Sequence, residues 1–145
     1  MSYLPDVNFL VSLFDPRHVN HETAHRWLES TPDLSWATCP ITENGCVRVL
    51  SNPAYPAVTT TPHDMCRRLG RFCARPDHVF WPDDVSILDS LDQATLARFT
   101  GHLQITDFYL AALSAAHHGA LTTFDVSLAR SLERTALEHA VLVVR

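Results

Sequence analysis

The sequence contains no lysine: all eleven of its basic residues are arginine, and they stand against sixteen acidic residues. The formal net charge is −5. A chain with a negative net charge does not hold nucleic acid by bulk positive charge alone. The composition still allows an enzyme whose bound cations supply the missing positive charge.

Long apolar runs and linkers are also missing. The uncharged stretch at residues 7–14 is far shorter than the ~20 residues that a membrane span needs, and no basic, apolar leader stands at the start. No Gly-, Ser- or Pro-rich segment divides the 145 residues, of which 46% are hydrophobic. The sequence therefore predicts a single soluble, cytoplasmic domain over residues 1–145, without a membrane segment.

Cysteine pairs of the kind that bind zinc or exchange disulfides are absent. The four cysteines, Cys39, Cys46, Cys66 and Cys73, include no C-x-x-C motif. We therefore expect small buried thiols in a reducing compartment rather than disulfides.

Short apolar strands alternate with helical segments along the chain. Strands are expected at residues 3–4, 34–39, 79–81, 120–124 and 140–144. Helices are expected at residues 8–14, 21–29, 42–50, 62–74, 86–99 and 107–118, with a further short helix before the last strand. This alternation predicts an α/β fold, a three-layer α/β/α sandwich with a mostly parallel central sheet.

Several helix ends carry recognisable signals. Thr61, which precedes a proline, is expected to cap the helix over residues 62–74. Asn20 and Thr106 are expected to cap the helices that follow them. Gly119 is expected in the left-handed conformation that ends the helix over residues 107–118.

Four acidic residues stand at junctions between strands and helices. Asp6 and Asp125 follow strands, whereas Glu43 and Asp107 lie in the first turns of helices. In a strand-helix-strand unit, the start of the helix and the end of the next strand share one edge of the sheet. The pattern therefore predicts all four carboxylates on one rim, where open parallel sheets bind their ligands.

Converging carboxylates restrict the chemistry of such a rim. Their mutual repulsion is strong where water is scarce, so protons or cations must neutralise it. Oxygen ligands favour Mg²⁺ or Mn²⁺ over zinc, and paired ions of this kind can activate water for attack on a phosphodiester. Receiver domains and aspartate-based phosphatases also place acids here, but both use a lysine, which this chain lacks.

Four segments of the chain carry a family resemblance. In order, they read "LPDVNFLVSLFD", "TCPITENGCVRVLSNPAYP", "FWPDD" and "ITDFYLAALSAAHHGALTTFD". Together they resemble the successive motifs of PIN-domain ribonucleases, in particular the VapC-type toxins of bacterial toxin-antitoxin pairs. The resemblance covers nearly the whole chain and implies a PIN-like α/β/α sandwich.

The resemblance also implies a function and a set of site residues. It implies a Mg²⁺- or Mn²⁺-dependent endoribonuclease that acts on RNA, is inhibited by a cognate antitoxin and forms a homodimer. The family's metal-binding, catalytic acids fall on four residues, Asp6, Glu43, Asp107 and Asp125. Asn8 matches a polar position that helps to orient the site, and Thr106 and Thr123 are candidates for the same supporting role.

An arginine stripe is the candidate surface for RNA. Arg67, Arg71 and Arg75 repeat every four residues along and just past the helix over residues 62–74, with Arg68 beside them. Such a stripe can follow RNA phosphates or meet an acidic antitoxin segment, and it can equally be a solvated face.

Two other functions compete with the nuclease interpretation. The segment "HETAH" matches the H-E-x-x-H pattern of zinc metallopeptidases, in which His21 and His25 would bind zinc and Glu22 would activate water. The glycine and third histidine of one such class are absent downstream, and these histidines also fit a solvated helix start. The second alternative is a non-catalytic PIN-like module that binds RNA.

Overall fold

The computed structural model describes residues 1–57 and 59–145. Within this part of the chain, five parallel strands form one sheet in the order β3-β2-β1-β4-β5. The strands are β1 (Tyr3–Pro5), β2 (Trp36–Thr38), β3 (His78–Phe80), β4 (Ala120–Thr123) and β5 (Val141–Val143). The chain first builds the sheet outward from β1 to β3 and then returns to place β4 beside β1, so the strand order reverses between β1 and β4.

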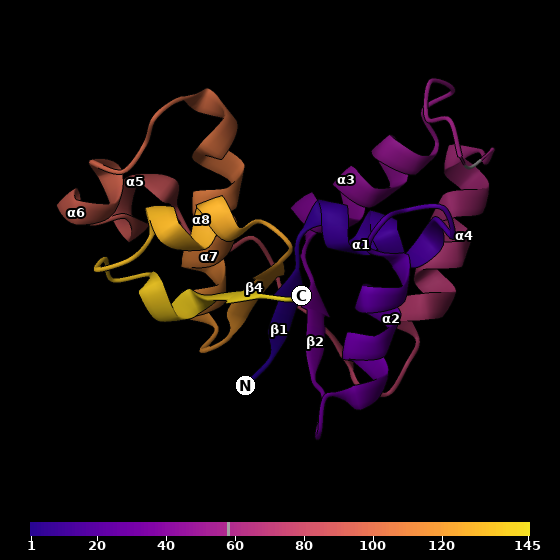
Figure 1. Ribbon diagram of the computed structural model, residues 1–145, viewed down its shortest axis with the longest axis horizontal. Coiled ribbons are helices and arrows are strands. Elements are labelled where there is room, and N and C mark those ends of the chain that lie inside the picture. Colours follow the sequence, from indigo (N-terminus) through magenta and orange to yellow (C-terminus); the bar gives the residue numbers. More distant parts are fainter. Residues whose placement is uncertain (58) are drawn as a thin grey trace.

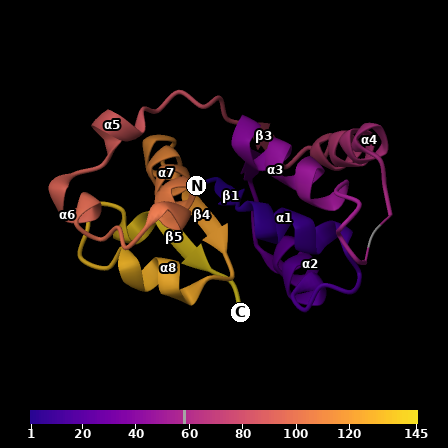
Figure 2. The same cartoon turned by 90° about the horizontal axis from the view of Figure 1, so that it is seen from above.

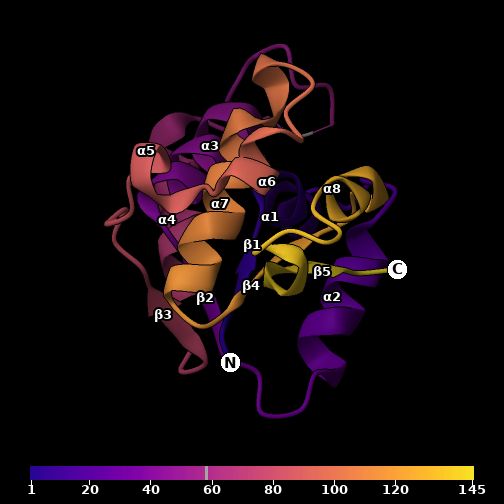
Figure 3. The same ribbon diagram turned by 90° about the vertical axis from the view of Figure 1, so that its left-hand side faces the viewer.

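Helices cover both faces of the sheet (Figure 1). One layer contains α1 (Val7–Phe14), α2 (His21–Ser30), α3 (Pro40–Leu50) and α4 (Pro62–Cys73). The other contains α5 (Ile87–Ser90), α6 (Gln93–Leu96), α7 (Ile105–Ala116) and α8 (Val126–Ser131), with the 3₁₀ turns η1 (His102–Gln104) and η2 (Glu138–Ala140). Figure 3 shows the second layer from its outer side, with α7 in front of the sheet. The predicted three-layer α/β/α fold is confirmed.

Each face of the sheet has its own hydrophobic core. Trp36, Phe9 and Leu10 are fully buried on the α1–α4 side. Ala37, the residue after Trp36, packs on the opposite side with Leu4 and the α7 residues. Successive strand residues thus bury side chains on opposite faces, as the short, nearly unbroken apolar strands of a covered parallel sheet require.

The helix start predicted at Thr61 is confirmed. Thr61 accepts a hydrogen bond from the Asp64 backbone N–H (3.1 Å), and Pro62 occupies the first turn of α4. Asn20 occupies the predicted N-cap position of α2, but its side chain makes no capping bond. α3 begins at Pro40, two residues before its predicted start at Thr42.

The single helix predicted over residues 86–99 is wrong. The segment forms α5 and α6, which are separated at Leu91, a buried residue in extended conformation. Asp92 then caps α6 by accepting a hydrogen bond from the Thr95 backbone N–H (2.8 Å). Burial of Leu91 and the new cap both stabilise the break, so helical propensity does not decide the outcome.

Both predicted ends of α7 also differ from the structure. The helix continues directly from η1 and begins at Ile105, with Gln104 at the N-cap, so Thr106 is not its cap. His118, with φ of 56°, takes the left-handed position predicted for Gly119. Gly119 is required for another reason: a Cβ there would lie 2.2 Å from the Ser2 carbonyl oxygen and 2.7 Å from the Trp81 ring.

The described residues contain no disulfide, as predicted, and all four cysteines are free thiols. Cys39 and Cys46 are buried, but Cys66 is exposed and Cys73 is partly buried, so the prediction that all are buried is wrong. No helix in the described part of the chain combines the length and apolar character that crossing a membrane requires.

Candidate active site

Three aspartates from different parts of the chain line one cavity of about 520 Å³. Asp6 follows β1, Asp107 lies in the first turn of α7, and Asp125 follows β4. The cavity therefore opens where the strand order reverses between β1 and β4, the usual ligand position in open parallel sheets. Figure 2 looks toward this edge, with β1, β4, α1 and α7 around it. The other polar lining residues are Asn8, His18, Tyr55, Thr106 and Thr123.

Asp6 is the most buried of the three carboxylates, with 8% of its surface exposed. It caps α1, and its Oδ1 accepts a hydrogen bond from the Phe9 backbone N–H (2.8 Å). Burial raises the pKa of Asp6 to about 6, although the Thr123 hydroxyl and the Phe9 N–H act to lower it. The negative charges of Asp107 and Asp125 raise it further, which places all three carboxylates within electrostatic reach of one another.

Asp107 and Asp125 stand closer to solvent. Asp107 is partly buried, and its pKa is raised first by burial and then by the charge of Asp125. Asp125 is exposed and caps α8: its Oδ1 accepts hydrogen bonds from the Ser127 backbone N–H (2.8 Å) and hydroxyl (2.6 Å). The solvent exposure of the three carboxyl groups therefore increases from Asp6 through Asp107 to Asp125.

Thr123 lies between two of these acids. Its hydroxyl accepts a hydrogen bond from the Asp125 backbone N–H (3.0 Å) and acts on the pKa of Asp6. The side chain is almost fully buried. This geometry agrees with a supporting role for Thr123, while Thr106 lines the same cavity as an exposed residue.

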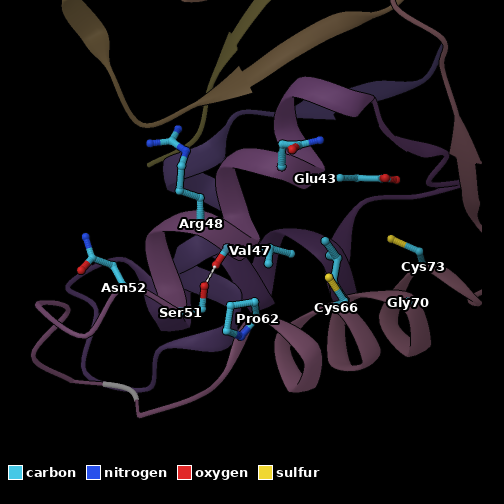
Figure 4. Close-up of a pocket in the computed structure, with 11 residues that line it drawn as sticks. Glu43, Val47, Arg48, Ser51, Asn52, Pro62, Cys66, Gly70 and Cys73 are labelled. Atoms are coloured by element: carbon cyan, nitrogen blue, oxygen red, sulfur yellow. Dashed lines mark hydrogen bonds between the residues drawn. The ribbon is translucent and has the colours of Figure 1, made fainter.

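Glu43 does not join the three aspartates. It lies in the first turn of α3, on the predicted rim, but its side chain lines a separate groove of about 740 Å³ between α3 and α4 (Figure 4). The Thr38 hydroxyl donates a hydrogen bond to Glu43 Oε1 (2.6 Å) and contacts His78 Nε2 (2.8 Å). The prediction that all four carboxylates meet is therefore wrong for Glu43 in this structure. Thr38 holds the Glu43 side chain on the side of His78, a residue of β3.

Tyr55 and His18 also line the cavity, and no pattern in the sequence predicted this. The Tyr55 hydroxyl donates to Asp15 Oδ2 (2.5 Å), and burial together with this bond raises the pKa of Tyr55 to about 12. Asp15 is itself buried at the end of α1. This pair fixes the segment after α3 against α1, and no local sequence signal connects residues 40 positions apart.

The cavity has the donor chemistry of a hard divalent cation. Its charged groups are carboxylates, and oxygen ligands of this type suit Mg²⁺ or Mn²⁺. Among residues 1–57 and 59–145, no three His, Cys, Asp or Glu side chains already form a metal-binding group. By the chemistry of their side chains, the residues of the cavity fit such an ion.

The two histidines of the "HETAH" segment have a structural role. His21 Nδ1 contacts the Ser12 carbonyl oxygen (2.7 Å), and His25 Nε2 contacts the Leu13 carbonyl oxygen (2.9 Å). These carbonyls belong to the last turn of α1, where helix carbonyls have no partner within the helix. The geometry gives no support to the zinc peptidase alternative, because in the described part of the chain these histidines do not belong to a group of three side chains that could hold a metal ion.

The arginine stripe is not uniformly available. Arg75 forms two hydrogen bonds with Asp77 (3.0 and 2.7 Å), and the Arg68 guanidinium lies 5.6 Å from the centre of the Phe14 ring. Arg67 and Arg71 are exposed on α4. Any contact of the stripe with RNA or a partner therefore falls mainly to Arg67 and Arg71.

Comparisons with known proteins agree with the fold. The PIN domain family profile matches residues 3–131. The chain therefore belongs to the PIN-domain family.

Within that family, its relatives are VapC proteins. Ribonuclease VapC44 of Mycobacterium tuberculosis is 44% identical over 131 residues, which cover 89% of each chain. Ribonuclease VapC39 of the same organism is 39% identical over 138 residues, covering 95% of this chain and 99% of that one. The crystal structure of M. tuberculosis VapC20, described as a sarcin-ricin loop cleaving toxin, superposes with a TM-score of 0.63 at 16% identity, covering 89% of this chain and 94% of that one. This last likeness confirms the fold.

Proposed function

We propose that this chain is a Mg²⁺- or Mn²⁺-dependent endoribonuclease and the toxin of a type II toxin-antitoxin pair. The relatives that are named ribonucleases match most of its length at 39–44% identity. The cavity formed by Asp6, Asp107 and Asp125 supplies a place for the chemistry. A cognate antitoxin and a second copy of the chain are the proposed protein partners.

The observation that carries the proposal is the buried carboxyl of Asp6 beside two further aspartates. Burial raises its pKa to about 6, and the charges of Asp107 and Asp125 raise it further, so the ionised form of Asp6 is disfavoured. A divalent cation removes this penalty, so the three aspartates are the residues that would hold it. When bound there, such an ion would activate water for attack on phosphorus and stabilise the leaving oxygen.

The side chains of the cavity prepare the carboxylates for this role. Asp6 and Asp125 each use Oδ1 to cap a helix, which fixes the carboxyl group and leaves Oδ2 for another ligand. Thr123 fixes the backbone of Asp125 and lies near Asp6. Asp107 enters from α7, on the other side of the cavity from α1. No protein side chain has to act as the nucleophile.

Cleavage mapping tests the proposal directly. Purified protein is incubated with a pool of structured RNAs, with and without Mn²⁺, and new 5′ ends are mapped. We expect discrete cuts that require the ion and leave 5′-phosphates, and we expect Asp107→Asn to lose them while its circular dichroism spectrum is unchanged. Binding of RNA without any ion-dependent cut would instead favour the non-catalytic RNA-binding module.

A further inference from the structure

The cavity lined by Asp6, Asp107 and Asp125, called the acid cavity below, also contains a histidine, His18. The proposed metal chemistry does not use this residue. It lies in the turn between α1 and α2, where its backbone N–H donates to the Asp15 carbonyl oxygen (3.0 Å) and its carbonyl oxygen accepts from the His21 N–H (3.0 Å). Its ring lies 6.4 Å from the ring of Phe124, the residue before Asp125. His18 is therefore a fixed part of the cavity wall.

Hydrogen bonding determines which nitrogen of His18 carries the proton. The Asn20 backbone N–H donates to Nδ1 (3.0 Å), so Nδ1 is an acceptor and holds no proton of its own. The proton of the neutral ring is then on Nε2, which lies 3.2 Å from Asn8 Oδ1. His18 therefore donates a hydrogen bond to Asn8.

This bond fixes the orientation of the Asn8 amide. An N–H donor at His18 Nε2 requires the carbonyl oxygen of Asn8 on that side, so the amide NH₂ group faces away from the ring. Asn8 is exposed at the edge of the cavity. Within the described part of the chain, Asn8 Nδ2 makes no hydrogen bond to protein, so it is available to a ligand.

Few neutral donors of the cavity are available in this way. The Tyr55 hydroxyl donates to Asp15, and Thr123 is engaged with Asp125 and Asp6. Asn8 Nδ2 and the Thr106 hydroxyl remain. An RNA phosphate that approaches three aspartates needs hydrogen-bond donors, and a neutral amide can supply one without competing with a metal ion for the carboxylates.

We propose that His18 is a positioning residue for substrate RNA: it holds the Asn8 amide so that Nδ2 donates to a phosphate oxygen beside the three aspartates. This inference rests on the proposed function and assigns a substrate contact within the same cavity. His18 does not touch the RNA in this scheme, and its effect passes entirely through Asn8.

Binding of fluorescein-labelled poly(U) RNA, measured by anisotropy with Mn²⁺ in an Asp107→Asn background, tests the proposal without cleavage. Loss of one hydrogen bond to a charged phosphate should weaken binding about tenfold in Asn8→Ala. His18→Ala should lose a similar factor, and the double variant should lose little more, because both changes remove the same contact. In the cleavage-competent protein, the same changes should raise KM with a smaller effect on kcat.

Conservative variants separate positioning from a general structural effect. His18→Gln can still donate to Asn8 and should recover most of the RNA affinity, whereas Asn8→Asp keeps the oxygen but lacks the NH₂ donor and should not. His139→Ala, which removes an exposed histidine of η2, is the matched control and should leave RNA binding unchanged.

Three results would overturn the inference while leaving the nuclease intact: unchanged affinity in Asn8→Ala, fully additive losses in the double variant, or no recovery in His18→Gln. If the unmodified protein neither binds nor cuts RNA, the proposed function itself fails. The two failures are therefore distinguishable.

Discussion

The acid cavity and the α3–α4 groove are both partly lined by α3, yet they differ in how their residues come together. The groove is the larger, at about 740 Å³ against about 520 Å³, but its wall is mostly apolar and its one carboxylate is Glu43. The cavity collects aspartates from three separate places, the β1–α1 junction, the first turn of α7 and the β4–α8 junction. Convergence of charged groups from distant parts of the chain therefore identifies the site better than volume does.

The sharpest test of this comparison substitutes one carboxylate of the acid cavity and the carboxylate of the α3–α4 groove. We expect Asp107→Asn to reduce Mn²⁺-dependent RNA cleavage by about a hundredfold or more, because it removes a proposed ligand of the ion. Glu43→Gln should reduce the rate by about tenfold or less, since Thr38 holds that side chain outside the cavity. Initial rates measured at saturating Mn²⁺ compare the two.

Equal losses in the two variants would mean that Glu43 turns into the cavity when the ion binds. Glu43 would then join the three aspartates in one site, as the family resemblance implies.

The burial of Asp6 predicts a stability effect that depends on pH. Its pKa is about 6 in the folded protein and 3.8 without the fold, so the folded state holds a proton that the unfolded chain releases between these values. The contribution of Asp6 to the free energy of unfolding therefore falls as the pH rises from about 4 to about 6. Without metal, Asp6→Asn should raise the free energy of unfolding at pH 7 by on the order of 2 to 3 kcal/mol.

Urea denaturation in EDTA at pH 4 and pH 7 measures this difference. The gain should be much smaller at the lower pH, because Asp6 is then almost fully protonated in the folded state and nearly half protonated in the unfolded chain. Asparagine is as good an N-cap as aspartate, so the start of α1 is preserved. Equal gains at both pH values would show that burial of charge is not their cause.

On the groove side, Thr38→Val removes the hydroxyl that holds Glu43. Thr38 is fully buried and contacts both Glu43 and His78, so we expect a loss of about 1 to 2 kcal/mol in unfolding free energy. The Mn²⁺ affinity, measured by calorimetry, should not fall, because the three aspartates are unaffected. A large fall would connect Thr38 to the acid cavity.

The smallest expected effect concerns two exposed arginines of α4 that line neither the acid cavity nor the α3–α4 groove. Replacing Arg67 and Arg71 together with alanine should weaken RNA binding a few-fold and reduce the slope of log K against log salt by about 0.7 for each lost phosphate contact. The control is Arg75→Ala, whose guanidinium is bound to Asp77. An unchanged slope in the double variant would assign the two exposed arginines to solvent or to the antitoxin.

The sequence predicted the position of the acids better than the direction of their side chains. Asp6, Asp107 and Asp125 follow from topology, because parallel strands joined by helices bring those positions to one edge. The same rule places Glu43 on the rim but does not determine its rotamer. A hydrogen bond from Thr38 determines it, and the partners of Thr38 depend on how β2 and β3 align.

Other differences arise from contacts between distant residues. Gly119 was expected to take the left-handed position, but its lack of a side chain serves the close approach of Ser2 and Trp81. His18 and Asn8 meet because the turn after α1 folds back along that helix. Periodicity and capping signals describe local structure only, so neither contact can be deduced from them.

The double use of Asp6 and Asp125 has an evolutionary consequence. Each carboxylate caps a helix with one oxygen, and asparagine can perform that task equally well. In the genetic code, a single nucleotide change converts an aspartate codon into an asparagine codon. A gene for this protein can therefore lose its proposed enzymatic activity in one mutational step while still encoding a folded protein that competes for the same partners.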